Sequence, residues 1–288
     1  MKTQYENRVI SSFLLWFDHT LLKKGEAFTN HSSKYYPIDS NFYGYTGYGA
    51  PFKQFVTDSS IPNATVASGV YVSGTSASDL KLTGQNPVVD INFEQGQVYF
   101  NTSIASDAIV SGNYAIKDFN VHLTSKAEQE VLFEDKISLR PSTTQTETGL
   151  APDVATYPAV FIKNNGGENE PFALGGQDAT ITNVRAIVLS DSQFNLDALC
   201  SIFKDQARLE VPILPDEKYP LNALGGLKSG VYNYTELISG IQDKVYLKNI
   251  EVSRFSLGYM ENLSNTNPDV FKAMIDFELE GHRFPRAS

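Results

Sequence analysis

The stretch from Val184 to Leu214 constrains the fold of this chain more than any other. It opens with an apolar run rich in valine and isoleucine, from Val184 to Leu189, which is typical of a buried strand. Gln193 follows Ser190 by three residues, the spacing of a capping box at the start of a helix, and Pro212 stops that helix from continuing. We therefore expect a strand that passes directly into a helix covering a sheet. The apolar residues that recur at helical spacing along that helix are Leu196, Leu199, Cys200, Phe203 and Ala207.

Residues 5–24 form the second clear helical pattern. Apolar side chains cover more than one stripe of this helix, and Gly25 follows it as a C-terminal signal. A helix that is apolar around most of its girth has to bury two faces. One face can pack on its own domain, and two interpretations stay open for the other: a central place in the chain's own core, or contact with a neighbouring subunit. Under the second interpretation, the candidate contact residues are Val9, Phe13, Trp16 and Phe17.

Aromatic side chains interleave with glycine and proline over residues 25–69. The run GYTGYGAP, residues 44–51, predicts neither a regular helix nor a central strand, because glycine and proline weaken both. It also lacks the G-x-G-x-x-G pattern, so we expect no phosphate site there. We interpret residues 1–69 as a helix followed by an aromatic, glycine-rich arm that packs on a partner, with sugar binding by stacked tyrosines as the alternative. The candidate contact residues of this arm are Tyr35, Tyr36, Phe42, Tyr43, Tyr45, Tyr48 and Phe52.

Residues 70–140 contain short alternating segments with turn signals between them, and we expect a small antiparallel β-sandwich or barrel. Its clearest element is a hairpin in which Glu94-Gln95-Gly96 turns between two strands. The other strands expected in this block lie at 70–72, 80–82, 119–123 and 130–139.

The chain after this block divides into a linker and a second domain. Residues 141–156 are polar and contain two prolines, so we expect a linker there. Residues 157–288 are expected to form an antiparallel or mixed sheet with a covering helix, with a loop or long hairpin tip before Asn183. The predicted fold class is therefore α+β.

Charge and residue counts argue against several classes of function. The net charge is -10 and is spread evenly, so we expect no basic patch for nucleic acid. The single cysteine, Cys200, excludes an internal disulfide and a multi-cysteine metal site. No motif for nucleophilic or phosphate chemistry occurs, and we predict no catalytic residues, no metal and no cofactor. None of the histidines has a partner at metal-ligand spacing; they are His19, His31, His122 and His282.

The N-terminal residues do not have the pattern of a targeting segment. Glu6 precedes the apolar run, no cleavage site follows, and the run from Phe13 to Phe17 is too short to span a bilayer. We therefore expect no membrane partner.

The order of elements after residue 157 resembles a known family. A strand (VRAIVLS), a helix (FNLDALCSIFKDQAR), a long loop, a strand (VYLKNIEVSR) and a final strand (MIDFELEGHRFPR) are similar to the tail-terminator proteins of tailed bacteriophages. The resemblance covers about residues 157–286, and the β-block at 70–140 is an addition to a minimal terminator. The closest local match is the pattern hydrophobic-x-Phe-x-Leu/Val-x-Gly-x-x-Phe/Tyr-Pro, here Ile275, Phe277, Leu279, Gly281 and Phe284-Pro285.

This resemblance implies a structural subunit of the virion, assembled in the host cytoplasm. Such subunits form hexameric rings at the head–tail interface, as a tail terminator or neck protein, which cap the tail tube and join it to the head connector. The implied partners are copies of the chain itself and the tail tube, sheath or head connector. DNA would pass through without sequence-specific binding, and an evenly acidic chain suits that role because like charges repel.

Three alternatives stay open. The first is another virion ring protein, such as an adaptor, stopper or baseplate subunit. The second is a carbohydrate-binding or adhesin-like module, which requires a platform of exposed tyrosines on one face. The third is an enzyme, which requires a pocket that gathers His122 or His282 with a carboxylate.

Overall fold

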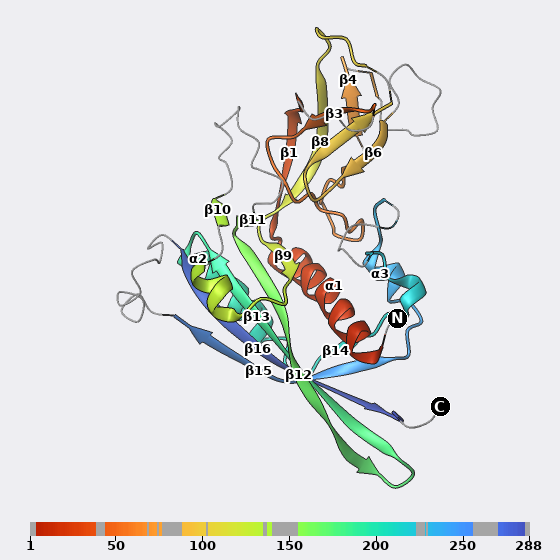
Figure 1. The fold of residues 1–288 in the computed structure, drawn as a ribbon, viewed down its shortest axis with the longest axis vertical. Helices are drawn as coiled ribbons and strands as arrows, with labels where there is room; N and C mark the ends of the chain where they lie inside the picture. Colours follow the sequence, from red (N-terminus) through yellow and green to blue (C-terminus); the bar gives the residue numbers. More distant parts are fainter. Residues whose placement is uncertain are drawn as a thin grey trace.

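The fold is mixed α+β, as the sequence predicts: an N-terminal helix, two small antiparallel sheets, and a six-stranded mixed sheet that curls and packs against a second helix. In Figure 1 the two small sheets lie at the top, and the six-stranded sheet with its helices lies below them. We call these two parts the sandwich and the lower body. The computed structural model describes residues 4–38, 44–67, 69–73, 75–76, 88–101, 103–134, 137–139, 155–222, 228, 230–255 and 270–285.

The sheet of the lower body has the strand order β14-β15-β16-β13-β12-β9. β9 pairs in parallel with β12, and every other neighbouring pair is antiparallel. The bounds are β9 (Asn120–Leu123), β12 (Ala159–Ala173), β13 (Gln177–Ser190), β14 (Glu210–Pro212), β15 (Lys244–Arg254) and β16 (Phe271–Arg283). β12 and β13 form a long hairpin, which is one of the two forms expected for the segment before Asn183.

The apolar run predicted to be a buried strand forms the end of β13, and both of its faces are covered. Ala186 and Val188 lie in the main core beneath the helices, whereas Ile187 and Leu189 lie in a separate cluster on the opposite face. This burial on both sides explains why the run is continuously apolar instead of alternating.

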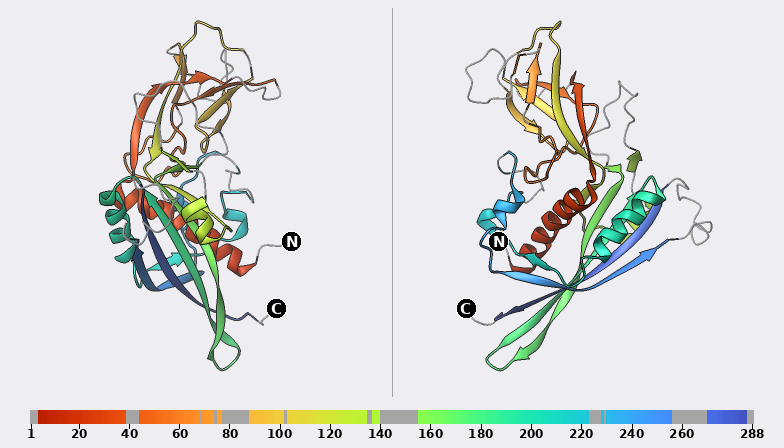
Figure 2. Two further views of the ribbon diagram at one scale, coloured as in Figure 1. Left: turned by 60° about the vertical axis from the view of Figure 1, so that its left-hand side comes forward. Right: turned by 180° about the vertical axis from the view of Figure 1, so that it is seen from behind.

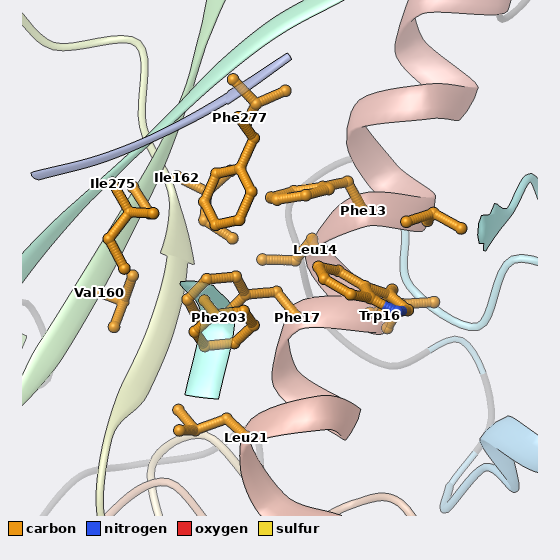
Figure 3. Packing of buried hydrophobic residues seen from close by; sticks show 14 of the residues in the cluster. Phe13, Leu14, Trp16, Phe17, Leu21, Val160, Ile162, Phe203, Ile275 and Phe277 are labelled. Atoms are coloured by element: carbon orange, nitrogen blue, oxygen red, sulfur yellow. The ribbon is translucent and has the colours of Figure 1, made fainter. Parts of the chain in front are cut away.

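The two predicted helices, α1 (Tyr5–Gly25) and α2 (Gln193–Lys204), contribute to one core on the same sheet. Phe17 of α1 stacks on Phe203 of α2, with ring centroids 3.8 Å apart and an interplanar angle of 8°. Phe277 of β16 meets both rings edge-on (Figure 3). The periodicity of both helices in the sequence therefore marks surfaces that are buried against each other and against the sheet.

The start of α2 differs slightly from the expectation. Its N-cap is Ser192 and not Ser190, because the hydroxyl of Ser190 donates to the carbonyl oxygen of Ser192, at 2.9 Å, just before the helix begins.

A short π-helix, η1 (Glu130–Glu134), covers the opposite face of the sheet. The prediction of a strand over 130–139 was wrong for residues 130–134. Among the described residues of that range, only β10 (Ile137–Leu139) is extended, and it pairs in parallel with β11 (Ala155–Tyr157). The reason is that Val131 and Leu132 are adjacent and are both buried in the same cluster. A strand would direct neighbouring side chains to opposite faces.

The sandwich consists of two four-stranded antiparallel sheets with the orders β1-β8-β4-β5 and β2-β3-β7-β6. Side chains from both sheets share one core, in which Tyr114 and Phe100 are fully buried, so the sandwich is the form that the predicted β-domain takes. The bounds are β1 (Phe28–Lys34), β2 (Tyr36–Pro37), β3 (Thr46–Gly49), β4 (Gly69–Val72), β5 (Thr75–Ser76), β6 (Val88–Asn92), β7 (Gln97–Phe100) and β8 (Val110–Lys117).

Residues 25–69 are more regular than expected. β1 pairs with β8 along its whole length, and β3 lies between β2 and β7, so the expectation that the GYTGYGAP run forms no central strand was wrong. Pairing on both edges of β3 and the burial of Tyr48 outweigh the low strand propensity of glycine.

Strand pairing groups the chain differently from the expected domain ranges. Strands from both sides of residue 69 build the sandwich, while α1 packs on the lower body and β9 belongs to the six-stranded sheet. The strand expected at 80–82 and most of the linker expected at 141–156 lie outside the described residues.

Two short helices complete the lower body, η2 (Asp216–Lys218) and α3 (Tyr234–Leu237). Figure 2 shows α1 between α3 and the six-stranded sheet, and Tyr234 of α3 belongs to the main core. Among the helices that the structure describes, none has a stretch long and apolar enough to cross a membrane.

Candidate functional site

Three strands of the six-stranded sheet continue beyond the body as a projecting ribbon (Figures 1 and 2). β12 loses its neighbour β9 after Ile162, and β15 parts from β16 at Glu280. β13 stays between β12 and β16 as far as Asp178. We call residues 164–183 together with 281–284 the ribbon.

The end of the ribbon presents apolar side chains to solvent. Phe172, Leu174 and Phe284 have exposed fractions of 59%, 104% and 54%, and we call these three residues the ribbon tip. The hairpin turns through Gly175 and Gly176, with φ of +100° and +86°, a backbone conformation that glycine adopts without strain. Covering apolar surface contributes about 25 cal/mol per Å². The ribbon tip is therefore the clearest candidate contact surface on the described part of the chain.

Contacts with the first turn of α1 hold the ribbon at two points, one on each outer strand. The guanidinium of Arg283 lies over the ring of Tyr5, 4.4 Å from its centroid, and its Nε donates to Thr180 Oγ1 at 2.7 Å. On the other side, Asn164 donates to the carboxylate of Glu6 at 2.8 Å. The ribbon is thus anchored to a buried helix and holds a defined direction.

The outer edge of β12 is protected against uncontrolled strand pairing. Beyond Ile162 this edge has no neighbouring strand among the described residues. It carries the exposed carboxylates Glu168 and Glu170 and then Pro171, which has no N–H to donate. Charges and proline on an edge strand disfavour pairing with another chain, so the tip and not the edge is the part of the ribbon suited to contact.

A cleft of about 800 Å³ lies between the sandwich and the lower body, with residues of α1, β6 and β9 in its walls. Lys117, the last residue of β8, donates to both carboxylate oxygens of Asp18 on α1, at 2.9 and 2.8 Å. Both side chains are largely buried. Removing one partner of a buried ion pair leaves an uncompensated charge, which is strongly destabilising. This ion pair therefore links the sandwich to α1 beside the cleft.

His122 of β9 also lines the cleft, and its ring stacks on Phe161 with centroids 5.5 Å apart. Burial, together with the nearby charge of Lys117, lowers the pKa of His122 to about 4, so its imidazole is neutral at neutral pH. Its Nε2 is buried and has no hydrogen-bond partner among the described residues.

Carboxylates in the same cleft come from Asp18, Asp90 and Glu94, so a histidine and carboxylates share one cavity as the enzyme hypothesis requires. Within the described ranges, however, none of them hydrogen-bonds to His122, and Asp18 is held by Lys117. The cleft offers hydrogen-bonding groups without an assembled acid–base pair.

A second buried polar group joins α1 to the loop before β4. Asp58 is fully buried and accepts hydrogen bonds from His19 Nδ1 at 2.7 Å, from the N–H of Tyr234 at 3.0 Å, and from the N–H and hydroxyl of Ser60. Burial alone would raise the pKa of Asp58, but these hydrogen bonds together hold it below its usual value. Since the carboxylate is ionised, His19 Nδ1 is the donor. The network fixes how the loop, α1 and α3 meet near the cleft.

The contact residues predicted from the sequence fall into three groups. Seven are packed inside the chain's own cores: Val9, Phe13, Trp16 and Phe17 in the lower body, and Tyr35, Tyr48 and Phe52 in the sandwich. Tyr36 and Tyr45 are exposed, with fractions of 42% and 47%. Phe42 and Tyr43 lie outside the described residues. For α1, burial in the chain's own core is thus the interpretation that the structure supports.

Sequence reasoning missed the ribbon tip. A signal for it was present, since Phe172 and Leu174 directly precede Gly175-Gly176 in a segment expected to hold a hairpin tip. Adjacent apolar side chains at an exposed turn have no core to enter, so they indicate a candidate contact surface.

No three His, Cys, Asp or Glu side chains in the described ranges gather in a way that could hold a metal ion. The chain matches no family model, and no curated protein is significantly similar to it.

Proposed function

We propose that this chain is a structural subunit of a tailed-bacteriophage virion that forms a ring at the head–tail interface, as a tail terminator or neck protein. The ring caps the tail tube and joins it to the head connector, and DNA passes through it. The observation that carries the proposal is the anchored ribbon with its exposed apolar tip. A surface of this kind gains free energy when another protein covers it, which is what a lasting assembly requires.

The arrangement of the lower body supports the same proposal. The segments whose order resembles tail terminators are β13, α2, β15 and β16, and they form one sheet with a covering helix. The segment that carries the closest local match, from Ile275 to Pro285, contains most of β16 and reaches the ribbon tip at Phe284. The resemblance therefore coincides with the part of the chain that bears the candidate contact surface.

The charge of the chain is compatible with a channel for DNA. The net charge is -10, and the exposed carboxylates Glu168 and Glu170 lie on the ribbon. An acidic surface repels DNA phosphates, so DNA would move past such a ring without being retained.

The proposal can be tested with tail tubes of the same virion and negative-stain imaging. The wild-type chain is expected to form rings and to cap one end of the tubes. A variant with Phe172→Ser and Leu174→Ser is expected to lose capping, because it removes apolar surface that the assembly covers. Phe194→Ser is the matched control, since Phe194 is 80% exposed on α2 and does not belong to the ribbon. Circular dichroism of all three proteins checks that they are folded.

Two outcomes would count against the proposal. Wild-type protein that neither forms rings nor binds tubes would contradict it outright. Binding to the end of the tube that is distant from the head would favour a baseplate subunit instead of a terminator.

A further inference from the structure

The ribbon tip and the cleft lie on different parts of the same chain. The ribbon projects from the lower body away from the sandwich (Figures 1 and 2). The cleft, in contrast, is lined by residues of the sandwich and of α1. In this fold the tip of one chain therefore cannot fill the cleft of that same chain.

Polar and apolar side chains line the cleft in about equal measure, and the apolar ones offer contacts to an apolar tip. Apolar side chains from several elements line it, among them Leu14 of α1, Ile91 of β6 and Leu123 of β9. Leu123 has an exposed fraction of 47%, so it is incompletely covered in the single chain. The volume of about 800 Å³ lies within the range of about 300–1,000 Å³ that binding pockets have.

Charged side chains near the ribbon tip and around the cleft limit the orientation in which the tip can enter the cleft. Glu168 and Glu170 are exposed on β12 just behind the tip. Lys228 is an exposed cation at the cleft, while Asp90 and Glu94 lie in the wall that β6 and its turn provide. The ribbon carboxylates are therefore attracted to the side of the cleft with Lys228 and repelled by the other wall.

We propose that the ribbon tip of one copy seats in the cleft of a second copy. Phe172 and Leu174 lie against the apolar wall, and Glu168 and Glu170 face Lys228. Because the two contacting patches differ, such contacts can follow one another head-to-tail, which generates a closed ring or an open filament, whereas a reciprocal pair of contacts would give a two-fold dimer. The ring proposed above requires the head-to-tail arrangement, which the double variant below distinguishes by a ladder instead of a single dimer band. The inference rests on the proposed function in one respect, the assembly of the chain with copies of itself, and it adds which surfaces meet.

A second copy is the occupant because the chain itself supplies both halves of the contact. One contact covers the exposed tip of one copy and the exposed Leu123 of the next. Around a closed ring, every tip and every cleft is then used once.

Cysteine cross-linking of the full chain tests this pairing of surfaces. Leu174→Cys places a thiol at the tip, and Leu123→Cys places one at the cleft; both positions are exposed, so the fold is expected to tolerate the changes. The natural Cys200 is buried, and the wild-type chain serves as the control for its reactivity. Each variant alone, their equal mixture and the double variant are treated with a short bismaleimide cross-linker, and the products are separated by denaturing electrophoresis.

We expect a cross-linked dimer in the mixture and in neither single variant, and a ladder of oligomers from the double variant. A dimer from Leu174→Cys alone would overturn the inference, because it would mean that tips meet tips. The inference would also be overturned if no cross-links formed although native mass spectrometry of the same samples shows rings. In that case the proposed ring function would stand. Cross-links that form an open filament and no ring would support the contact but contradict the proposed function. Protein that never associates would overturn both.

Discussion

Replacing Phe17 with alanine is expected to destabilise the lower body strongly. Phe17 is fully buried, stacks on Phe203 at 3.8 Å, and meets Phe277 edge-on at 6.1 Å (Figure 3). Truncating a buried phenylalanine to alanine costs about 3–5 kcal/mol, a range that includes the loss of aromatic pairs worth roughly 0.5–1.5 kcal/mol each. We therefore expect the free energy of unfolding to fall by about 4 kcal/mol.

The chain contains its own reporter for this experiment. Trp16, the only tryptophan, lies in the same core with its ring 5.9 Å from that of Phe203. Urea unfolding followed by tryptophan fluorescence therefore reports on this core. If the free energy of unfolding falls by about 3 kcal/mol per M of urea, a loss of about 4 kcal/mol lowers the urea concentration at the unfolding midpoint by about 1.3 M.

Phe194→Ala is the matched control, because this side chain is 80% exposed on α2, and its effect should stay within about 0.5 kcal/mol. The shift caused by Phe17→Ala should be the same at low and high protein concentration, since the ring packs within one chain. A small shift, or a shift that changes with concentration, would refute the reasoning and favour a subunit contact for α1.

Three further predictions concern buried polar groups and one turn. Asp58→Ala should lower the free energy of unfolding by about 3 kcal/mol or more, since it leaves the donor of His19 and others unpaired; a loss below about 1 kcal/mol in urea unfolding would contradict it. The folded pKa of His122 is about 4 and the ordinary value is 6.5, so the unfolded chain binds this proton first. The free energy of unfolding should therefore fall by up to about 3 kcal/mol as the pH drops from 6.5 to 4, whereas above pH 6.5 the contribution of His122 is fully present. His122→Gln should remove this part of the pH dependence, which is measured by unfolding at several pH values. Gly96→Ala should cost about 1–3 kcal/mol in thermal unfolding, because Gly96 has φ +65° and a Cβ there would collide with the carbonyl oxygen of Phe52; an unchanged melting temperature would count against it.

The elements that follow from a local sequence pattern, such as helical periodicity or a continuous apolar run, could be predicted from the sequence. α1 and α2 follow from helical periodicity, and the continuous run in β13 follows from burial on both faces. β3 and η1 did not follow. The glycines of β3 are tolerated because neighbouring strands pair with both of its edges, and the π-helix η1 is fixed by the burial of Val131 and Leu132 against a distant sheet. In both cases tertiary contacts outweigh the local preference.

The candidate site was predicted less well, because it depends on contacts between distant segments. Of the tyrosines predicted as contacts, Tyr36 and Tyr45 are exposed and Tyr35 and Tyr48 are buried, because aromatic composition does not distinguish a tyrosine inside a sandwich from one on its surface. The bond between His19 and Asp58 joins residues 39 positions apart, a separation with no local signal. The projection of the ribbon depends on where β9 and β15 stop pairing, which no single segment reveals.

The central claim, assembly of this chain into a ring, is tested most directly by native mass spectrometry of the purified full chain over a range of concentrations. We expect a closed oligomer, with the six-fold ring foremost, and we expect the variant that carries Phe172→Ser and Leu174→Ser to lose it. A chain that stays monomeric at every concentration, and also after tail tubes are added, would contradict the account.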